Sequence, residues 1–214
     1  MSKGPQRFIP LSQVVEEHGL DRDAFLSAFP HALLVLDEIG EPDSEVGQFQ
    51  TIAAKVDEPD QGPQGRMLTK LLGKLPGGSG QKWVAPLDNR AKKFACILTV
   101  GRAANSDMRI NVPSLSKFHA YFTHVAKDGC WYLADANSSN GTFINGRELP
   151  TSHGKVRLEN GSFIRFGPDV TGHFYESEAF WELMHSAVES GEGSTEPPAQ
   201  SGVSGAGGDE EASA

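Results

Sequence analysis

Three short segments of the sequence combine residue types that together can bind a phosphate group. Gly101-Arg102 supplies a guanidinium, Ser116-Lys117 supplies a hydroxyl and an ammonium, and Ser138–Thr142 supplies further hydroxyls, a carboxamide and a glycine. A planar guanidinium can form two hydrogen bonds to one phosphate, and hydroxyl and main-chain N–H groups can take the remaining oxygens. If the fold brings these segments together, they predict recognition of a phosphate monoester.

The elements that would position these segments follow from a two-residue periodicity that begins near residue 82. Three Asn-Gly pairs and one Asp-Gly pair mark turns between short apolar-alternating runs. This spacing predicts a mainly β fold, a two-sheet antiparallel sandwich with binding residues in the loops at its ends. The expected strands are Lys82–Pro86, Phe94–Val100, Met108–Ile110, His119–Val125, Cys130–Asp135, Thr142–Ile144, Lys155–Leu158 and Ser162–Phe166.

Residues 1–80 show a mixed α/β pattern and no chemical motif. Ser12 is expected to cap one short helix, and Asp21 a second helix that ends before Pro30. The other expected elements are a buried strand at Ala32–Leu36, a partner strand at Gln48–Val56, a loop at Asp57–Gly65, a helical turn at Met67–Lys74 and a flexible stretch at Pro76–Gly80.

The C-terminal part divides into a helix and a tail. Apolar residues recur at three- and four-residue spacing over Ser177–Glu189, which predicts one helix docked on the core. Residues 191–214 contain no aromatic residue, Lys or Arg, so we expect a disordered acidic tail. The expected domain limits are 1–80 for an N-terminal extension, 81–175 for the sandwich, 176–190 for the helix and 191–214 for the tail.

Charge is unevenly distributed along the chain. The net charge is −9, yet residues 90–170 carry eleven Lys and Arg against six Asp and Glu, so this segment is +5 and the remainder −14. A basic module between acidic flanks favours an anionic ligand for the module. The first residues lack the apolar run of a secretory signal, and Cys96 and Cys130 are too few for a disulfide scaffold; we therefore expect a cytoplasmic location and two reduced cysteines.

Other chemistries are weaker interpretations of the same residues. Ser116, His119 and Asp135 could in principle form a nucleophile, a base and an orienting group, but no Gly-x-Ser-x-Gly elbow accompanies them. His119 and His124 would point to opposite faces of one strand, so no metal site or other cofactor is expected. The acidic remainder of the chain argues against nucleic acid as the partner, and no nucleic-acid motif is present.

Taken in order, the segments Gly-Arg, Ser-Lys-Phe-His and Ser-Ser-Asn-Gly-Thr-Phe-Ile-Asn-Gly resemble the signature of the forkhead-associated (FHA) domain family. The resemblance is tight from Leu98 to Gly167 and looser over the surrounding sandwich. It implies an eleven-stranded β-sandwich whose loops bind phosphothreonine peptides and catalyse nothing. It says nothing about residues 1–80.

The resemblance also implies roles for individual residues. Arg102 would bind the phosphate, Ser116 would donate its hydroxyl, and Lys117 would meet the phosphate through its backbone or side chain. Ser139 stands where the family often has threonine, and Asn140 would hold the ligand's main chain beside the phosphorylated residue. The residues implied to shape the loops are Gly101, His119, Gly141 and Asn145.

The function expected on this basis is a phosphothreonine-dependent adaptor in Ser/Thr kinase signalling, with phosphothreonine-containing proteins as partners and neither nucleic acid nor membrane. The alternative is a phosphate-independent scaffold that uses the same sandwich for assembly. A further hypothesis concerns Thr195, which lies in a Gly-Ser-Thr-Glu-Pro context in the tail. Phosphorylated, it would be a tethered ligand for the basic loops or would join two molecules.

Overall fold

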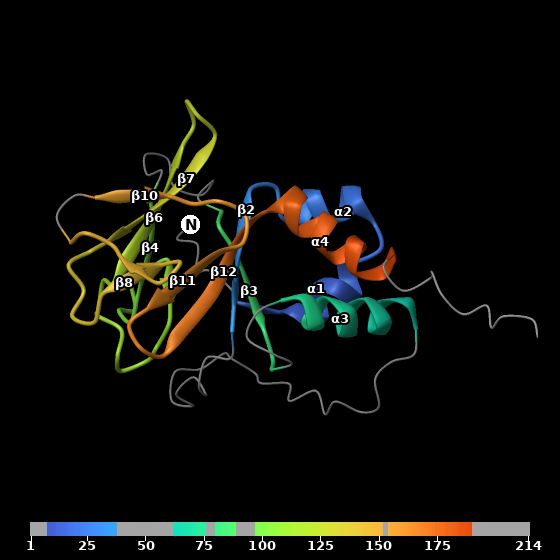
Figure 1. Cartoon of the computed structure of the whole chain (residues 1–214), viewed down its shortest axis with the longest axis horizontal. Coiled ribbons are helices and arrows are strands. Elements are labelled where there is room, and N and C mark those ends of the chain that lie inside the picture. The colour runs from blue at the N-terminus through green and yellow to red at the C-terminus, as the bar shows by residue number, and fades with distance from the viewer. Residues whose placement is uncertain (1–7, 38–61, 76–79, 89–96, 152–153, 190–214) are drawn as a thin grey trace, which may run out of the picture.

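The computed structural model describes residues 8–37, 62–75, 80–88, 97–151 and 154–189, and its strands form two sheets (Figure 1). The smaller sheet has the strand order β10 (Lys155–Arg157), β7 (Cys130–Asp135), β6 (Ala120–Val125), β4 (Ile97–Gly101) and β5 (Met108–Arg109). The larger sheet has the order β1 (Ile9–Pro10), β3 (Trp83–Pro86), β2 (Ala32–Leu36), β12 (Val170–Glu176), β11 (Ser162–Phe166), β8 (Thr142–Ile144) and β9 (Arg147–Glu148).

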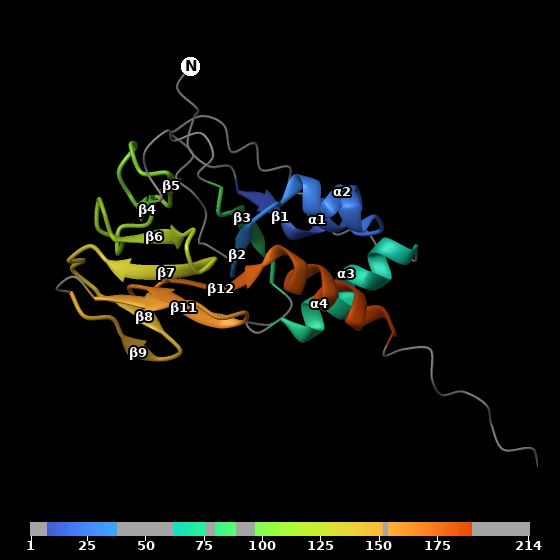
Figure 2. The ribbon, with the colours of Figure 1, turned by 90° about the horizontal axis from the view of Figure 1, so that it is seen from above.

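The two sheets pack face to face and enclose one hydrophobic core, and Figure 2 shows them as two layers. Phe122 and Leu133 reach this core from the smaller sheet, and Ile164, Phe166 and Phe174 reach it from the larger one. Phe122 and Phe166 meet edge to face, with their ring centroids 6.3 Å apart. The chain is therefore a mainly β sandwich, as the sequence predicts.

Four helices cover the outer side of the larger sheet where β1, β3, β2 and β12 run, and they lie beside the sandwich in Figures 1 and 2. They are α1 (Leu11–His18), α2 (Arg22–Ala28), α3 (Pro63–Lys74) and α4 (Ser177–Glu189). Strand β2 is buried on both sides. Leu34 and Leu36 face the sandwich core, whereas Leu33 and Val35 face a second core with the helices. One strand thereby joins the two cores.

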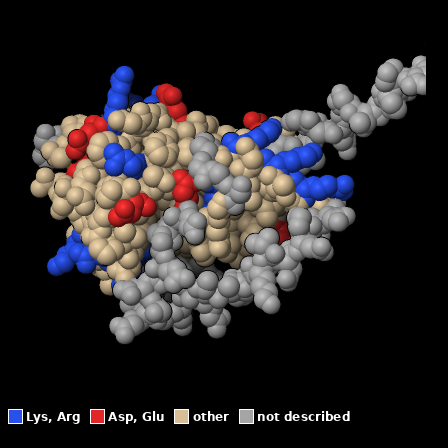
Figure 3. Space-filling model, turned by 60° about the horizontal axis from the view of Figure 1, so that its bottom comes forward, with Lys and Arg blue, Asp and Glu red and all other residues tan. Residues whose placement is uncertain are grey.

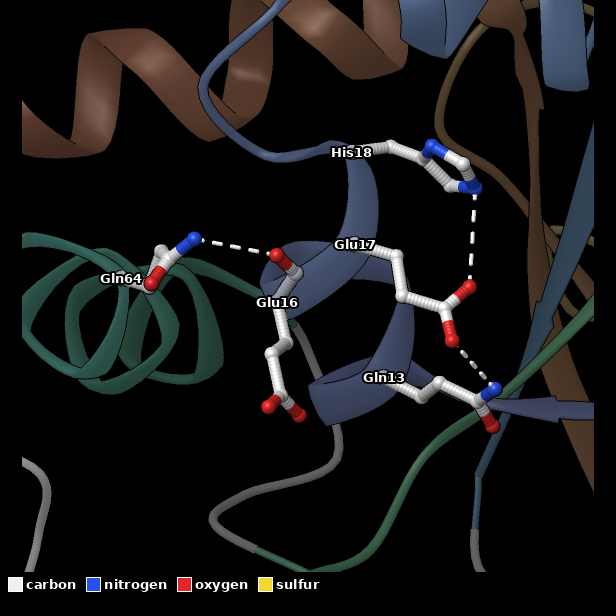
Figure 4. A network of polar contacts seen from close by, with 5 residues as sticks. All are labelled: Gln13, Glu16, Glu17, His18 and Gln64. Carbon is white, nitrogen blue, oxygen red and sulfur yellow. Dashed lines mark hydrogen bonds and ion pairs between the residues drawn. The ribbon is translucent and has the colours of Figure 1, made fainter.

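Polar contacts also hold the helices to one another. The Gln64 side chain donates a hydrogen bond to the main-chain oxygen of Glu16 at 3.0 Å, which connects α3 to the end of α1 (Figure 4). Lys74 Nζ donates to the main-chain oxygen of Ser186 at 2.7 Å, so the end of α3 also contacts α4. These contacts make the helical layer one packed unit rather than a set of separate arms.

Most strands lie where the periodicity predicts them, and three were not expected. The bounds of β2, β7, β8, β11 and α4 are those predicted, while β1, β9 and β12 are additional. Strand β12 escaped prediction because its sequence holds only three apolar residues, Val170, Phe174 and Tyr175, separated by Thr171, Gly172 and His173. Gly172 also interrupts it where the backbone of β2 passes close by: a Cβ there would lie 2.7 Å from the Val35 carbonyl oxygen.

The sandwich differs from the expectation in two further respects. The described residues form twelve strands, where the resemblance implied eleven. The pair β4 and β5 is parallel, whereas the other strand pairs of the described residues are antiparallel. The sandwich is antiparallel as predicted apart from this edge, where the chain crosses from β4 to β5 by a loop instead of a hairpin.

Two local expectations for the N-terminal region were wrong. Ser12 does not cap α1: the helix begins at Leu11, whose N–H donates to the Lys82 carbonyl oxygen at 2.9 Å, so β1 continues directly into the helix. Pro63–Gly65 was expected to be loop but forms the first turn of α3, where a proline at the first position suits a helix. Asp21 caps α2 as predicted, with its carboxylate accepting from the Ala24 N–H.

Several expectations fall on residues outside the described ranges, namely the strand at Gln48–Val56, the stretch 76–79, Cys96 and the tail 191–214. Within the described ranges, β2 pairs with β12 and β3 instead. The larger sheet thus contains strands from both sides of residue 80, although the domain limits themselves stay a prediction.

Candidate functional site

The three segments with phosphate-binding residue types meet at one end of the sandwich. Gly101 ends β4, Ser116 lies in the loop that leads into β6, and Ser139 lies in the loop between β7 and β8. The Ser116 hydroxyl oxygen accepts a hydrogen bond from the Ser139 N–H at 3.0 Å, and the two hydroxyl oxygens are 3.4 Å apart. Residues 23 positions apart in the sequence are therefore adjacent in the fold.

The turn after β4 is held against the loop that contains Ser116. The Arg102 N–H donates to the Ser116 carbonyl oxygen, and the Ala103 N–H donates to the Lys117 carbonyl oxygen, both at 3.0 Å. Gly101 allows this close approach, since a Cβ there would lie only 2.2 Å from the Lys117 oxygen. The backbone beside Arg102 is consequently fixed before any ligand arrives.

The Arg102 side chain is exposed and partly anchored. Its Nε donates to the Leu115 carbonyl oxygen at 3.2 Å, while its two outer nitrogens have no hydrogen-bond partner among the described residues. Lys117 is also exposed at this end of the sandwich. Arg102 thus presents a cationic group to solvent near Ser116, and Lys117 is a second exposed cationic residue in the same loop.

His119 joins the two loops from inside. Its side chain is fully buried; its Nδ1 accepts from the Ser116 N–H at 3.2 Å, and its Nε2 lies 3.1 Å from the Gly141 carbonyl oxygen. Because Nδ1 acts as the acceptor, Nε2 carries the hydrogen and donates to Gly141. Burial lowers the pKa of His119 below its ordinary value, although the Gly141 carbonyl and the Asp135 charge act in the opposite direction. The neutral ring therefore serves as a structural bridge.

Asp135 holds the loop between β7 and β8. Its carboxylate accepts from the Ser138 hydroxyl and the Thr142 hydroxyl, both at 2.6 Å, and from the Ser138 N–H at 2.9 Å. Burial alone would raise the pKa of Asp135, but these hydrogen bonds outweigh it and hold the pKa below its ordinary value. The carboxylate is thus charged and internally satisfied, and it shapes the loop that carries Ser139.

Asn140 and Gly167 close the side of the site. The Asn140 amide donates to the Ser114 carbonyl oxygen at 2.8 Å, so part of this side chain already links two loops. Gly167 has a positive φ of 60° and packs against Asn140 and Ser114. A Cβ at Gly167 would lie only 3.3 Å from the Ser114 oxygen. Its N–H donates to the Gly141 carbonyl oxygen at 2.9 Å.

Two of the residues expected to shape loops have left-handed backbones. Gly141 has a φ of 72° and Asn145 a φ of 50°. Asn145 and Gly146 form the two-residue turn between β8 and β9, for which positive φ at both positions is the favoured geometry. The Asn145 side chain also accepts from the Phe163 N–H at 2.9 Å, which holds the hairpin to β11.

The side chains do not form a catalytic arrangement of nucleophile, base and orienting group from Ser116, His119 and Asp135. His119 accepts from the main-chain N–H of Ser116, and the Ser116 hydroxyl is paired with Ser139. Asp135 bonds to Ser138 and Thr142 rather than orienting the imidazole. No nucleophile–base hydrogen bond is present in this set.

Three further residues, Ser114, Leu115 and Gly167, belong to the site and were not expected from the sequence. Ser114 and Leu115 act through their carbonyl oxygens, which accept from Asn140 and Arg102. Main-chain acceptors carry no side-chain signal, so nothing in the residue types could identify them. Gly167 follows the Phe166 end of β11, and a glycine after a strand was the only available indication.

Among the described residues, no three His, Cys, Asp or Glu side chains are close enough together to hold a metal ion. None of the helices in these ranges combines the length and apolar character required to cross a membrane. Basic and acidic side chains are interspersed on the sandwich part of the face in Figure 3, while several basic side chains stand together at its helical end.

Comparison with known proteins identifies the sandwich. The model of the FHA domain matches residues 98–167. Human sarcolemmal membrane-associated protein is 37% identical over 73 residues, which is 33% of this chain and 9% of that protein. Human kanadaptin is 33% identical over 90 residues, 38% of this chain and 12% of that protein. The chain thus spans only about a tenth of the length of these relatives.

Solved structures of FHA domains are also similar to this chain. An N-terminal FHA domain from S. cerevisiae, in complex with a phosphothreonine peptide, is 26% identical with a TM-score of 0.35, and the match covers 40% of this chain and 72% of that one. The matched residues 98–167 include the three loops described above, from the turn after β4 to Gly167. Residues 98–167 of this chain are therefore similar to the forkhead-associated domain family, whose model they match.

Proposed function

We propose that the loops around Arg102, Ser116 and Ser139 bind a phosphothreonine side chain of a partner protein. The observation that supports this most is the position of Arg102. Its backbone is fixed by Ser116, its Nε is held by Leu115, and its outer nitrogens face solvent beside the paired hydroxyls of Ser116 and Ser139. A phosphate at this point would receive charge-assisted bonds from groups that are already ordered.

Each further residue of the site has a role in this proposal. Lys117 adds a second cationic group, and Asn140, which already bonds to the Ser114 oxygen, lies next to Ser139 for contact with the ligand's main chain. Gly101, His119, Gly141 and Asn145 shape the loops and do not touch the ligand. Phosphothreonine would be preferred to phosphoserine, because one additional buried carbon is worth roughly 1 kcal/mol.

At the level of the whole chain, we propose an adaptor that reads the product of a Ser/Thr protein kinase in the cytoplasm. The solved yeast FHA domain holds a phosphothreonine peptide, which is the chemistry assumed for the partner here. Phosphorylation of Thr195 in the tail would create a ligand within the same chain or between two copies.

The test is direct binding of the full chain to a library of fluorescent phosphothreonine peptides, measured beside the same library without phosphate. We expect saturable binding of a subset of phosphopeptides and no measurable binding of their unphosphorylated counterparts. Glutamate in place of phosphothreonine should not restore binding, because it carries one charge and two oxygens against nearly two charges and three. Equal binding of both libraries would instead establish the phosphate-independent scaffold.

A further inference from the structure

An acidic side chain stands at the edge of the proposed phosphothreonine site. Glu148 is exposed on β9, which pairs with β8 immediately after the loop that carries Ser139 and Asn140. Its carboxylate lies against Gly141: a Cβ built on Gly141 would be 2.7 Å from Glu148 Oε1. Since Gly141 follows Asn140 directly and its carbonyl accepts from His119, the carboxylate adjoins the loop that is proposed to hold the ligand's main chain.

This carboxylate differs from Asp107 and Asp135, two other acids near the loops, in having no partner among the described residues. Asp107 accepts from the N–H and hydroxyl of Thr99, and Asp135 accepts from Ser138 and Thr142. The Glu148 carboxylate has neither an ion pair nor a hydrogen bond among the described residues. Its acceptor capacity is therefore available to a ligand.

An aromatic ring lies beside the carboxylate. Phe143 is the cross-strand partner of Glu148, and its ring edge also flanks Gly141, with Cε2 3.1 Å from the position of a Cβ there. The Arg165 guanidinium stacks over this ring, 3.7 Å from its centroid, and donates to the Gly167 carbonyl oxygen at 2.7 Å. The ring is thereby held in place, and it is partly exposed.

We infer that Glu148 and Phe143 form a second subsite, which selects phosphothreonine partners with a Lys or Arg close to the phosphorylated residue. The methylene stem of such a side chain would pack on Phe143 while its cationic head pairs with Glu148. This inference rests on the proposed function, because the subsite acts only on a peptide already bound through its phosphate.

The charge of the ligand gives this inference a specific, measurable consequence. A bound phosphate brings nearly two negative charges to the loop beside Gly141, where the Glu148 carboxylate repels them, although Arg102 and Lys117 of the proposed site offset part of this repulsion. Removing the carboxylate must then affect two kinds of peptide in opposite directions. A peptide with a basic residue loses an attractive partner, whereas a peptide without one is relieved of repulsion.

The experiment uses the full chain and peptides of alanine around one phosphothreonine, with a single Lys placed in turn at each flanking position. We expect at least one position where Lys strengthens binding by about two- to five-fold, the range of an exposed ion pair. Glu148→Gln should weaken binding of that peptide and slightly strengthen binding of the peptide without Lys. Raising the salt concentration should reduce the preference.

Glu159→Gln is the matched control, because Glu159 is an exposed glutamate at the Ser162 end of β11, opposite Gly167. It should leave both affinities unchanged. If Lys gives no preference at any position, or if Glu148→Gln shifts both peptides in the same direction, the subsite is wrong while the proposed function stands. If the phosphothreonine peptides do not bind at all, the proposed function is wrong and this inference with it.

Discussion

Arg102 presents the strongest single interaction of the proposed site. Arg102→Ala should lower the affinity for a phosphothreonine peptide by about 2–4 kcal/mol, roughly thirty- to a thousand-fold, because charge-assisted hydrogen bonds to the phosphate are lost. Arg102→Lys should not restore binding, since an ammonium cannot reproduce the planar fork. Isothermal titration calorimetry measures both variants.

The matched control for Arg102 is Arg66→Ala, which removes an exposed arginine from α3, in the helical layer away from the loops. This variant should bind like the wild type. Thermal unfolding should be nearly unchanged for Arg102→Ala, because an exposed side chain adds little to stability. Undiminished binding by a folded Arg102→Ala protein would contradict the assignment of this residue.

The buried side chain of His119 makes the free energy of unfolding depend on pH. Its pKa is lowered by burial in the folded chain, whereas in the unfolded chain it titrates near its ordinary value of about 6.5. The unfolded chain therefore binds the proton more tightly. Stability is fully present above about pH 6.5, declines as the pH falls through that value, and levels off below the folded pKa. The pKa of His173 is also lowered by burial and acts with the same sign.

Urea unfolding at about pH 7.5 and pH 5.5 tests this dependence. The free energy of unfolding of the wild type should fall as the pH falls, and His119→Gln should show a shallower fall because the contribution of His119 is lost while that of His173 remains. The variant should also be less stable at both pH values, since one side of the bridge between Ser116 and Gly141 is lost. Identical pH slopes would show that His119 does not titrate as described.

At the scale of elements, the contact between β4 and the loop that carries Ser116 depends on a glycine. Gly101→Ala places a Cβ 2.2 Å from the Lys117 carbonyl oxygen, and relieving that overlap moves the backbone beside Arg102. We expect a loss of about 1–3 kcal/mol in stability, as for other overpacked sites, together with weaker phosphopeptide binding. Thermal unfolding and peptide titration provide the two measurements.

A second glycine gives the opposite expectation and serves as the control. Gly73 lies near the end of α3, and a Cβ there would meet no atom within 4 Å. Gly73→Ala should therefore be neutral or stabilising by up to about 1 kcal/mol, because alanine favours the helix. Destabilisation of equal size in both variants would mean that the substitution itself, and not the close approach at Gly101, is responsible.

At the scale of the whole molecule, β2 couples the helical layer to the sandwich. Leu33 and Leu34 are adjacent and fully buried, but Leu33 faces the helices and Leu34 faces the sandwich core. Leu33→Ala and Leu34→Ala should each cost about 2–5 kcal/mol, the usual range for a buried leucine. Both should shift one common unfolding transition, because neither core can open without releasing the shared strand.

Differential scanning calorimetry, with phosphopeptide binding as a second signal, distinguishes one cooperative unit from two. If the helical layer were separate, Leu33→Ala would lower only one of two transitions and leave the temperature at which peptide binding is lost unchanged. That outcome would also support a domain boundary near residue 80, whereas a single transition would place residues from both sides of it in one unit.

The part of the site that consists of side-chain groups could be predicted from the local sequence. Arg102, Ser116 and Ser139 were identified by type and order, and the structure brings their loops together. The strands with one polar and one apolar side, such as β11, were likewise predictable, because alternation directly reflects burial on a single face. Strand β2 was found as a continuous apolar run, which is typical of burial on both faces.

Only the tertiary structure decided which distant segments contact one another. The pairing of β2 with β12, 134 residues apart at the contact of Asp37 with Thr171, leaves no local pattern in either strand. Main-chain acceptors such as the Leu115 and Ser114 oxygens, and the placement of Glu148 against Gly141, depend on how loops pack and not on which residues they contain. A sequence determines burial and turn preferences locally, but contact across a sheet depends on the sum of many weak interactions that no short segment encodes.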